Sequence, residues 1–318
     1  MDRARTPGPR GGSSGGAARV VGSAPLGVPV SFRYVLLDFD GTLTAPEHVT
    51  DAFLAEYRAE FLAGVGEGHA ALYDRTLAAV RAASPQLGWT LDSYEACPIA
   101  ADPYILASAV ATRVLASIDQ GDALRALPND LYARLYTKHR APFRPEVPDA
   151  LAALHATGAT LAVVSNASTG KIEARLDELL GDTALRRAIG VIGGARKFSV
   201  REATTTTPAR AAFEALPDTT PRATWGALGR PTWLRRGAFF DALAAVWGAD
   251  AGAPAATIFC GDIWELDLVL PAALGCAVHL VERAAPLATH DEERHAAATT
   301  PDAGFSRDLW GLVERVRA

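Results

Sequence analysis

Cysteine is scarce in this sequence: the 318 residues include three cysteines, and no two of them have CxxC spacing. An odd number of separated cysteines predicts no disulfide framework, and the lack of paired thiols argues against a thiolate zinc site. Free thiols are typical of a reducing compartment. The N-terminal arginines are not followed by the apolar stretch of a secretory signal, so we expect a cytoplasmic protein.

The sequence also lacks long apolar runs and an excess of positive charge. No run is long enough to span a bilayer, so no membrane segment is predicted. The formal net charge of −5 and the pI of about 5.8 argue against nucleic acid or an anionic membrane as the main partner. Hydrophobic residues make up 49% and charged residues 21%, a balance that allows a large globular core.

Composition divides the chain into a tail, a core and an insertion. Residues 1–30 are rich in Gly, Ser, Pro and Arg, which predicts a disordered tail. Residues 48–144 place apolar residues at helical spacing and contain no convincing strand, which predicts an all-helical insertion of small-domain size. Residues 31–47 and 145–318 remain for the core.

Short apolar runs alternate with helical stretches in the core segments. The predicted strands are Tyr34–Leu37, Thr160–Val164, Ile189–Ile192, Thr257–Cys260 and 276–281. Alternation of this kind predicts βα units. We therefore expect an α/β fold with a Rossmann-like, mainly parallel sheet, and the helical insertion as a cap over it.

Aspartates follow two of the predicted strands. Asp38 and Asp40 come directly after the first strand, and Asp262 and Asp267 follow the strand that ends near Cys260. Ligands of open parallel sheets bind beyond the carboxyl ends of the strands, so these side chains are expected to converge. Mg²⁺ prefers oxygen ligands, which makes Asp38 and Asp262 a candidate pair. A single Asp after a strand is more often a turn or cap residue, but the joint pattern favours a site.

Groups suited to bind phosphate are predicted at the same edge of the sheet. Ser165 and Asn166 follow the second strand and precede a helix, whose first N–H groups can donate to phosphate oxygens. Lys197 follows the third strand and adds positive charge. Lys171, in the first turn of the helix after Ser165, is the alternative lysine. Its simpler interpretation is that of an exposed surface residue.

At these residues the sequence resembles the haloacid dehalogenase-like (HAD) hydrolase superfamily, over about residues 31–47 and 145–285. The motifs that match are DxDGT at residues 38–42, a serine that ends an apolar strand at Ser165, and GDxxxxD at residues 261–267. The remaining motif is a single lysine, for which Lys197 is the candidate. The insertion resembles the helical C1-type caps of the superfamily only by its position and helicity.

The resemblance implies a covalent mechanism. Asp38 would attack phosphorus and form an aspartyl-phosphate, a recognised form of covalent catalysis. Asp40 would protonate the leaving group and then activate water. Ser165, Asn166 and Lys197 would hold the transferring phosphoryl group.

The resemblance also implies the metal ligands. Mg²⁺ would be bound by Asp38, by the backbone carbonyl of Asp40 and by Asp262. Thr42 and Asp267 would support the site. The metal would offset the substrate's negative charge and allow a carboxylate to approach phosphorus.

Asp40 separates the activities found in the superfamily. Members that cleave carbon–halogen bonds lack the second aspartate and need no metal, so dehalogenation is not expected. The predicted function is the magnesium-dependent hydrolysis of a small phosphorylated metabolite. The alternatives are a phosphomutase similar to β-phosphoglucomutase, which uses the same intermediate, and a catalytically silent binding protein.

Two features depart from the superfamily pattern. Lys197 precedes Phe198, where many relatives have proline, and the separation of 65 residues between Lys197 and Asp262 implies an inserted segment. In that segment, Arg235 and Arg236 either contact phosphate or begin a solvated helix.

The substrate and the oligomeric state are not predicted by these motifs. Selectivity in such an architecture depends on cap side chains near the nucleophile. Residues 97–102 and 64–68 are the two candidate cap segments.

Overall fold

Six parallel strands form the central sheet, in the order β5-β4-β1-β6-β7-β8. Their bounds are β1 Tyr34–Leu37, β4 Thr160–Val164, β5 Ile189–Ile192, β6 Thr257–Gly261, β7 Ala277–Val281 and β8 Ala303–Ser306. The computed structural model describes residues 32–91, 94–119, 122–220 and 231–318, so the tail expected at 1–30 lies outside the described residues. The predicted mainly parallel α/β fold is confirmed, and five of its strands lie where the sequence predicts them.

β1 lies between β4 and β6 in the middle of the sheet. In the strand register Leu37 is level with Val163 on one side and with Cys260 on the other. All three strands are short apolar runs with buried side chains, as expected for a parallel sheet that is covered on both faces. The residues that follow these strands are therefore neighbours at one edge.

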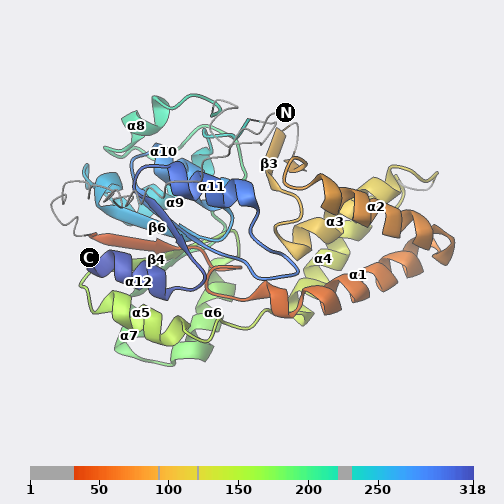
Figure 1. Cartoon of the computed structure of the whole chain (residues 1–318), viewed down its shortest axis with the longest axis horizontal. Coiled ribbons are helices and arrows are strands. Elements are labelled where there is room, and N and C mark those ends of the chain that lie inside the picture. Colours follow the sequence, from red (N-terminus) through yellow and green to blue (C-terminus); the bar gives the residue numbers. More distant parts are fainter. Residues whose placement is uncertain (1–31, 92–93, 120–121, 221–230) are drawn as a thin grey trace, which may run out of the picture. The chain divides into compact units, whose positions relative to one another are not determined.

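Helices cover both faces of the sheet, as Figure 1 shows. One face carries α5 Val147–His155, α6 Thr169–Leu180, α7 Ala184–Ala188 and α12 Trp310–Arg317, and the other carries α8 Arg210–Glu214, α9 Gly237–Trp247, α10 Val269–Ala273 and α11 Asp291–Thr299. Alternate residues of a strand point to opposite faces. Accordingly, Val35 and Leu37 pack in one buried cluster, whereas Leu36 packs in the other.

The insertion between β1 and α5 forms a cap with a hydrophobic cluster of its own. It contains α1 Thr50–Val65, α2 Ala70–Ala83, α3 Pro103–Leu115 and α4 Leu127–Lys138, with short 3₁₀ turns at Pro46–His48 and Glu67–His69. Its buried centre includes Phe53 and Tyr57 of α1, Val110 of α3 and Leu131 of α4. These residues recur at helical spacing, which is the pattern that predicts the helices.

Two sets of strands are absent from the sequence prediction. The cap is not wholly helical, because β2 Gly88–Leu91 pairs antiparallel with β3 Tyr94–Pro98. In the core, β8 follows the strand that was expected to be the last. All three strands have only four or five residues, too few for an alternating pattern to stand out from its surroundings. β8 also lies at the edge of the sheet and is partly exposed, so it lacks a continuous apolar run.

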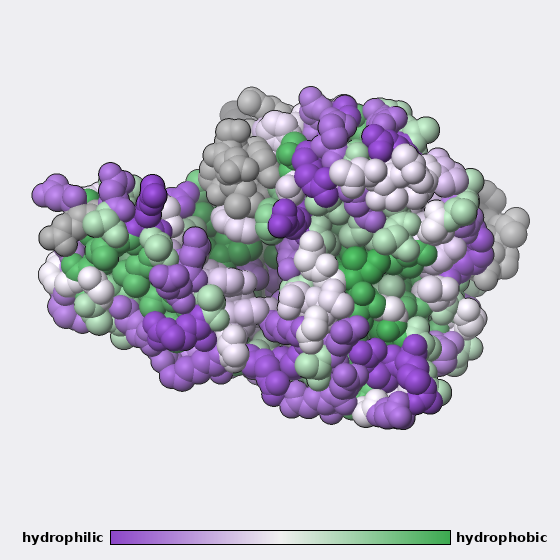
Figure 2. Space-filling view, turned by 180° about the vertical axis from the view of Figure 1, so that it is seen from behind, coloured by the Kyte–Doolittle hydropathy of each residue, from purple (hydrophilic) through white to green (hydrophobic). Residues whose placement is uncertain are grey.

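The surface in Figure 2 is largely hydrophilic, with hydrophobic residues gathered in patches. Large exposed hydrophobic side chains are Tyr132, Phe305 and Trp310. Among the described residues, no helix combines the length and the apolar character needed to cross a membrane.

Candidate active site

Asp38, Ser165 and Asp262 lie side by side where β1, β4 and β6 end. The N–H of Asp38 donates to the Cys260 carbonyl at 2.9 Å, so the sheet pairing continues for one residue beyond β1. All three side chains are buried. The structure thus brings together residues more than two hundred positions apart, as the strand-end argument predicts.

Lys197 lies against the aspartates and is itself fully buried. Its Nζ is 2.5 Å from Asp38 Oδ1 and 2.8 Å from Asp267 Oδ1. Its backbone N–H donates to Asn166 Oδ1 at 2.7 Å, which fixes the loop that carries the lysine. Burial lowers the pKa of Lys197, but the carboxylates of Asp267 and Asp38 more than offset this and raise it. The lysine is therefore held in its charged form beside Asp38.

Lys171 occupies a different place in the site. Its Nζ lies 4.0 Å from Asp40 Oδ2 and 3.2 Å from the centroid of the Tyr136 ring. Burial lowers its pKa. Of the two candidate lysines, Lys197 is the one bonded to Asp38, whereas Lys171 faces Asp40.

Three buried carboxylates can converge on one cation. Asp38, Asp262 and Asp267 each offer an oxygen, and these atoms all lie within 4.8 Å of one another. The Asp40 carboxylate is not part of this group. The set contains oxygen ligands only, which suits a hard divalent cation better than a soft one.

The electrostatics of these carboxylates also fit a cation. Burial raises the pKa of Asp38 to about 7, against the lowering effect of Lys197. Burial also raises the pKa of Asp262 well above its usual value, against the lowering effect of Arg283. Like charges this close favour protonation of one partner unless a cation offsets them. A divalent cation would therefore keep the group ionised.

The loop after β1 approaches Asp262 so closely that it needs a glycine. Gly41 has a φ of +88°, and a Cβ at this position would lie 2.3 Å from Asp262 Oδ2. The next residue, Thr42, donates from Oγ1 to Asp262 Oδ1 at 3.4 Å. Buried Arg144 donates to the Gly41 carbonyl at 2.8 Å. The glycine of the DxDGT motif is thus required for the close approach of this loop to Asp262 of the GDxxxxD motif.

A buried ion pair holds the loop that carries Asp262. Arg283 forms an ion pair with Glu293 of α11 and donates to the Asp262 carbonyl. The other Glu293 oxygen accepts from the Trp264 N–H at 3.0 Å. Arg283 and Glu293 belong to none of the matched motifs, so no sequence pattern pointed to them.

Arg236 was expected to contact phosphate or to begin a solvated helix, but the structure gives it a different role, as a buried donor to the backbone. Its side chain is fully buried, and Nη1 donates to the Glu265 carbonyl at 2.7 Å and to the Leu266 carbonyl at 3.2 Å. It therefore neither begins a solvated helix nor lines the cavity described below. Arg235 pairs instead with Glu202.

The cap contributes directly to the surroundings of Asp40. The Tyr136 hydroxyl of α4 donates to Asp40 Oδ2 at 2.5 Å. Burial raises the pKa of Tyr136 far above its ordinary range, and the nearby Asp40 charge adds to this. The phenol is therefore a permanent donor to this carboxylate. A tyrosine at helical spacing is normally a core residue, so the sequence did not point to it.

A cavity of about 760 Å³ lies beside these groups. Its core lining includes Asp38, Asp40, Ser165, Asn166, Lys171, Asp262 and Asp267, and its cap lining includes Trp89, Asp102, Tyr104, Tyr132 and Tyr136. Of the two candidate cap segments, 97–102 supplies Asp102 to the lining, whereas 64–68 supplies no lining residue. Cys97 and Ala101 of the same segment pack on Ile263 and Leu266, next to the metal-ligand candidates.

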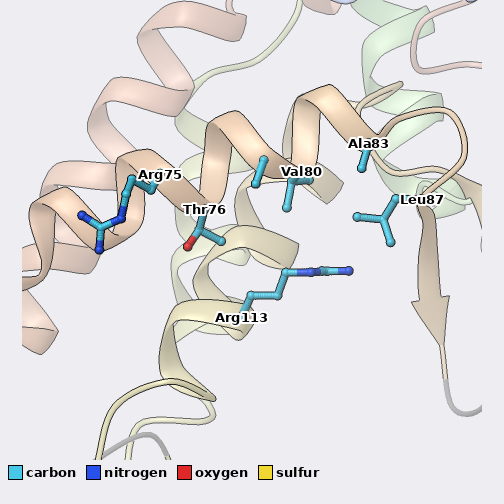
Figure 3. Close-up of a pocket in the computed structure, with 7 residues that line it drawn as sticks. Arg75, Thr76, Val80, Ala83, Leu87 and Arg113 are labelled. Atoms are coloured by element: carbon cyan, nitrogen blue, oxygen red, sulfur yellow. The ribbon is translucent and has the colours of Figure 1, made fainter.

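A second cavity, of about 420 Å³, lies between α2 and α3 and is shown in Figure 3. Its lining is largely apolar, with Arg75 and Arg113 as its charged residues. It holds no carboxylate and none of the residues of the larger cavity. The chemistry of this chain is therefore placed in the larger cavity.

Comparison with known proteins identifies the family. A family model described as haloacid dehalogenase-like hydrolase matches residues 32–216, more than half of the chain. The matched region includes Asp38, Asp40, Ser165 and Lys197. No curated protein matches this sequence.

Several solved structures are similar to this chain at low sequence identity. A predicted phosphoglycolate phosphatase from Haemophilus somnus 129PT is 17% identical and covers 89% of this chain and 97% of its own, with a TM-score of 0.48. L-2-haloacid dehalogenase from Xanthobacter autotrophicus is 16% identical, with 90% and 99% covered and a TM-score of 0.44. The magnesium-bound HAD-hydrolase YfnB from Bacillus subtilis is 13% identical, with 90% and 99% covered and a TM-score of 0.47. These likenesses do not separate phosphatase from dehalogenase. The family-model match does establish that the chain belongs to the haloacid dehalogenase-like hydrolases.

Proposed function

We propose that the protein is a magnesium-dependent phosphatase that hydrolyses a small phosphate ester through an aspartyl-phosphate on Asp38. The observation that carries the proposal is the position of Asp40. Its carboxylate lines the same cavity as Asp38 but lies outside the group of three carboxylates suited to a cation. It is therefore placed to give a proton to a departing alkoxide, which a departing halide ion would not need.

Phosphate binding would use the polar side chains at the ends of the strands. Ser165 lines the cavity and can donate its hydroxyl proton to a phosphate oxygen. The ammonium group of Lys197 holds Asp38 in place through its hydrogen bond to Asp38 Oδ1. Bound Mg²⁺, held by Asp38, Asp262 and the backbone of Asp40, would supply charge neutralisation at phosphorus. Fixed donors and charges of this kind favour the transition state because they need no reorganisation.

The reaction would then proceed in two steps. In the first, an Asp38 carboxylate oxygen attacks phosphorus, the bond from phosphorus to the ester oxygen breaks, and Asp40 gives its proton to the departing alkoxide. In the second, Asp40 takes a proton from water, whose oxygen attacks the phosphorus of the aspartyl-phosphate. Asp38 is released as a carboxylate together with inorganic phosphate. General acid–base catalysis of this kind typically contributes about 10²–10⁴-fold.

The test is phosphate release from a broad panel of phosphate esters by the wild type and by Asp38→Asn. The wild type should release phosphate only with Mg²⁺ present, and the variant should fall below about one-thousandth of its rate. Melting curves would verify that the variant is folded. Turnover by Asp38→Asn close to wild type would contradict the proposal, as would activity that persists after chelation of the metal.

The same assay addresses the alternatives. A phosphomutase would return the phosphoryl group to an organic acceptor, so free phosphate would not accumulate in step with substrate loss. A silent binding protein would bind Mg²⁺ and release no phosphate from any ester.

Cytoplasmic location is part of the proposal. It is supported by the three cysteines, which are all buried and free.

A further inference from the structure

Asp102 is a cap carboxylate that reaches the cavity without an ion-pair partner. Its Oδ1 accepts from the N–H groups of Tyr104 and Ile105 at 2.7 and 3.0 Å, which makes it the N-cap of α3. The residue is partly buried and lines the cavity. Helix capping uses one oxygen, and the described residues show no hydrogen bond to Oδ2. The second oxygen is therefore available to a ligand.

The cations nearest to Asp102 are committed to other carboxylates. Within the described chain, no lysine, arginine or histidine lies within 4.0 Å of its carboxylate. Arg283 is paired with Glu293, and Lys171 faces Asp40. Burial raises the pKa of Asp102 to about 6, so the group is mainly ionised at neutral pH. An enclosed charge without a partner is costly, and a cationic ligand would remove that cost.

Aromatic rings form the cap wall around this carboxylate. Tyr104 and Tyr136 meet edge to face with centroids 4.6 Å apart, and Tyr132 stacks on Tyr136 at 5.4 Å. Trp89 also lines the cavity, in edge contact with Phe198 at a centroid distance of 4.9 Å. Ring faces attract ammonium groups, most strongly where water is excluded. Lys171 already illustrates this, since its ammonium group lies over Tyr136.

We propose that the substrate is the phosphate ester of a small alcohol that carries an ammonium group, bound by Asp102 and the neighbouring tyrosine rings. The inference rests on the phosphatase function proposed above. The phosphate would lie at Asp38 and Ser165, and the ammonium group at the cap end of the same cavity. A volume of about 760 Å³ accommodates such a molecule.

A pair of esters with the same shape tests the charge alone. Phosphocholine and 3,3-dimethylbutyl phosphate differ in having nitrogen or carbon at the branched centre, so that only the first carries a positively charged group there. The wild type should show a kcat/KM for phosphocholine at least about tenfold above that for the neutral ester. Phosphoethanolamine, as a third substrate, separates a preference for a quaternary ammonium from one for a primary amine.

The Asp102→Asn variant removes the charge and keeps the cap, because Asn is as good an N-cap as Asp. The preference for the cationic ester should fall to about one, through loss on that ester. The matched control is Asp74→Asn, which removes a negative charge elsewhere in the cap, where Asp74 pairs with Arg58. The control should keep the preference, which excludes a long-range effect of cap charge.

The outcomes separate the two proposals. Equal hydrolysis of the two esters, or a preference that survives in Asp102→Asn, would overturn the ammonium assignment and leave the phosphatase function standing. Hydrolysis of other esters but of neither probe would do the same. No phosphate release from any ester would overturn the phosphatase function. Calorimetry with the folded Asp38→Asn variant gives a second readout, in which phosphocholine should bind at least about tenfold more tightly than the neutral ester.

Discussion

The core and cap sides of the cavity are built in different ways. On the core side, buried Lys197 bonds to both Asp38 and Asp267, which are also buried, and Asp262 is held by Arg283. On the cap side, the lining includes four aromatic side chains, and the three tyrosines among them contact one another through their rings. Fixed charges suit a reaction at phosphorus, which requires preorganised geometry. Aromatic surfaces suit recognition of the remainder of the substrate. The comparison predicts that core changes affect every ester alike, whereas cap changes alter the choice between esters.

The largest effect is expected from Asp40, a core residue that faces the cap. Asp40→Asn should lower kcat by about 10³-fold or more for all esters, because neither the leaving group nor water would find its proton partner. Intact-mass measurement should show whether the phosphorylated enzyme accumulates. Asp51→Asn, at the exposed start of α1, is the control. A loss that differs strongly between esters would show that Asp40 serves substrate recognition. It would contradict the expectation that core changes affect every ester alike.

A smaller effect is expected from the ion pair behind the metal-ligand loop. Glu293→Gln should weaken Mg²⁺ affinity by about 10–100-fold, since groups that orient metal ligands typically contribute this much. The affinity is measured by calorimetry at a temperature where the variant is folded. Glu282→Gln removes a carboxylate that pairs with Arg294 nearer the surface and should leave the affinity unchanged. An unaltered affinity in folded Glu293→Gln would mean that the loop needs no such support.

The stability of the core should also depend on the protonation of a buried histidine that lies outside the site. Burial lowers the pKa of His279 on β7 from 6.5 to about 3. Between these values the unfolded chain binds the proton and the folded chain does not, so stability falls as pH drops below 6.5. The free energy of unfolding should lose about 2 kcal/mol from this residue between pH 7 and pH 5. The raised pKa values of Asp38 and Asp262 act in the opposite direction, so the share of His279 is read as a difference between proteins. In urea titrations between pH 7 and pH 5, the stability change of the wild type and of His155→Gln, where the exposed residue is replaced, should be about 2 kcal/mol less favourable than that of His279→Gln. Equal changes in all three proteins would contradict it.

The smallest effect is expected from the cap hydroxyl on Asp40. Tyr136→Phe should lower kcat by about tenfold or less, because one hydrogen bond to a charged group is removed while the ring remains. Tyr57→Phe removes a buried cap hydroxyl that donates to the Pro128 carbonyl and serves as the control for cap stability. A change in KM for one ester alone would place Tyr136 wholly on the recognition side.

Much of the fold is visible in the sequence because short-range patterns encode it. Strands such as Tyr34–Leu37 and Thr160–Val164 are apolar runs followed by turn residues, and both occur at the predicted positions. The pair β2–β3 and the edge strand β8 were missed because their stability comes from pairing and packing rather than from a local apolar pattern. Helices α1 to α4 were visible because each buries a regularly spaced stripe.

Parts of the site were visible for the same reason. Asp38 and Asp40 are two residues apart at the end of a strand, so their placement needs no information about distant packing. Asp262 follows from the same rule applied to β6. The structure places Asp267 among the possible cation ligands, in addition to the expected pair. That position depends on the turn at Trp264–Leu268, where the backbone forms a π-helical turn that a spacing rule does not describe.

Local sequence is enough to place Asp38 at the carboxyl edge of a parallel sheet, because strand propensity and chain direction are local properties. The bonds from Lys197 to Asp38, 159 residues away, and from Tyr136 to Asp40, 96 residues away, arise from tertiary packing alone. The same packing places Asp102 in the lining of the cavity. Such contacts depend on how separate helices and loops pack together, and side-chain periodicity fixes the buried face of an element but not its partner.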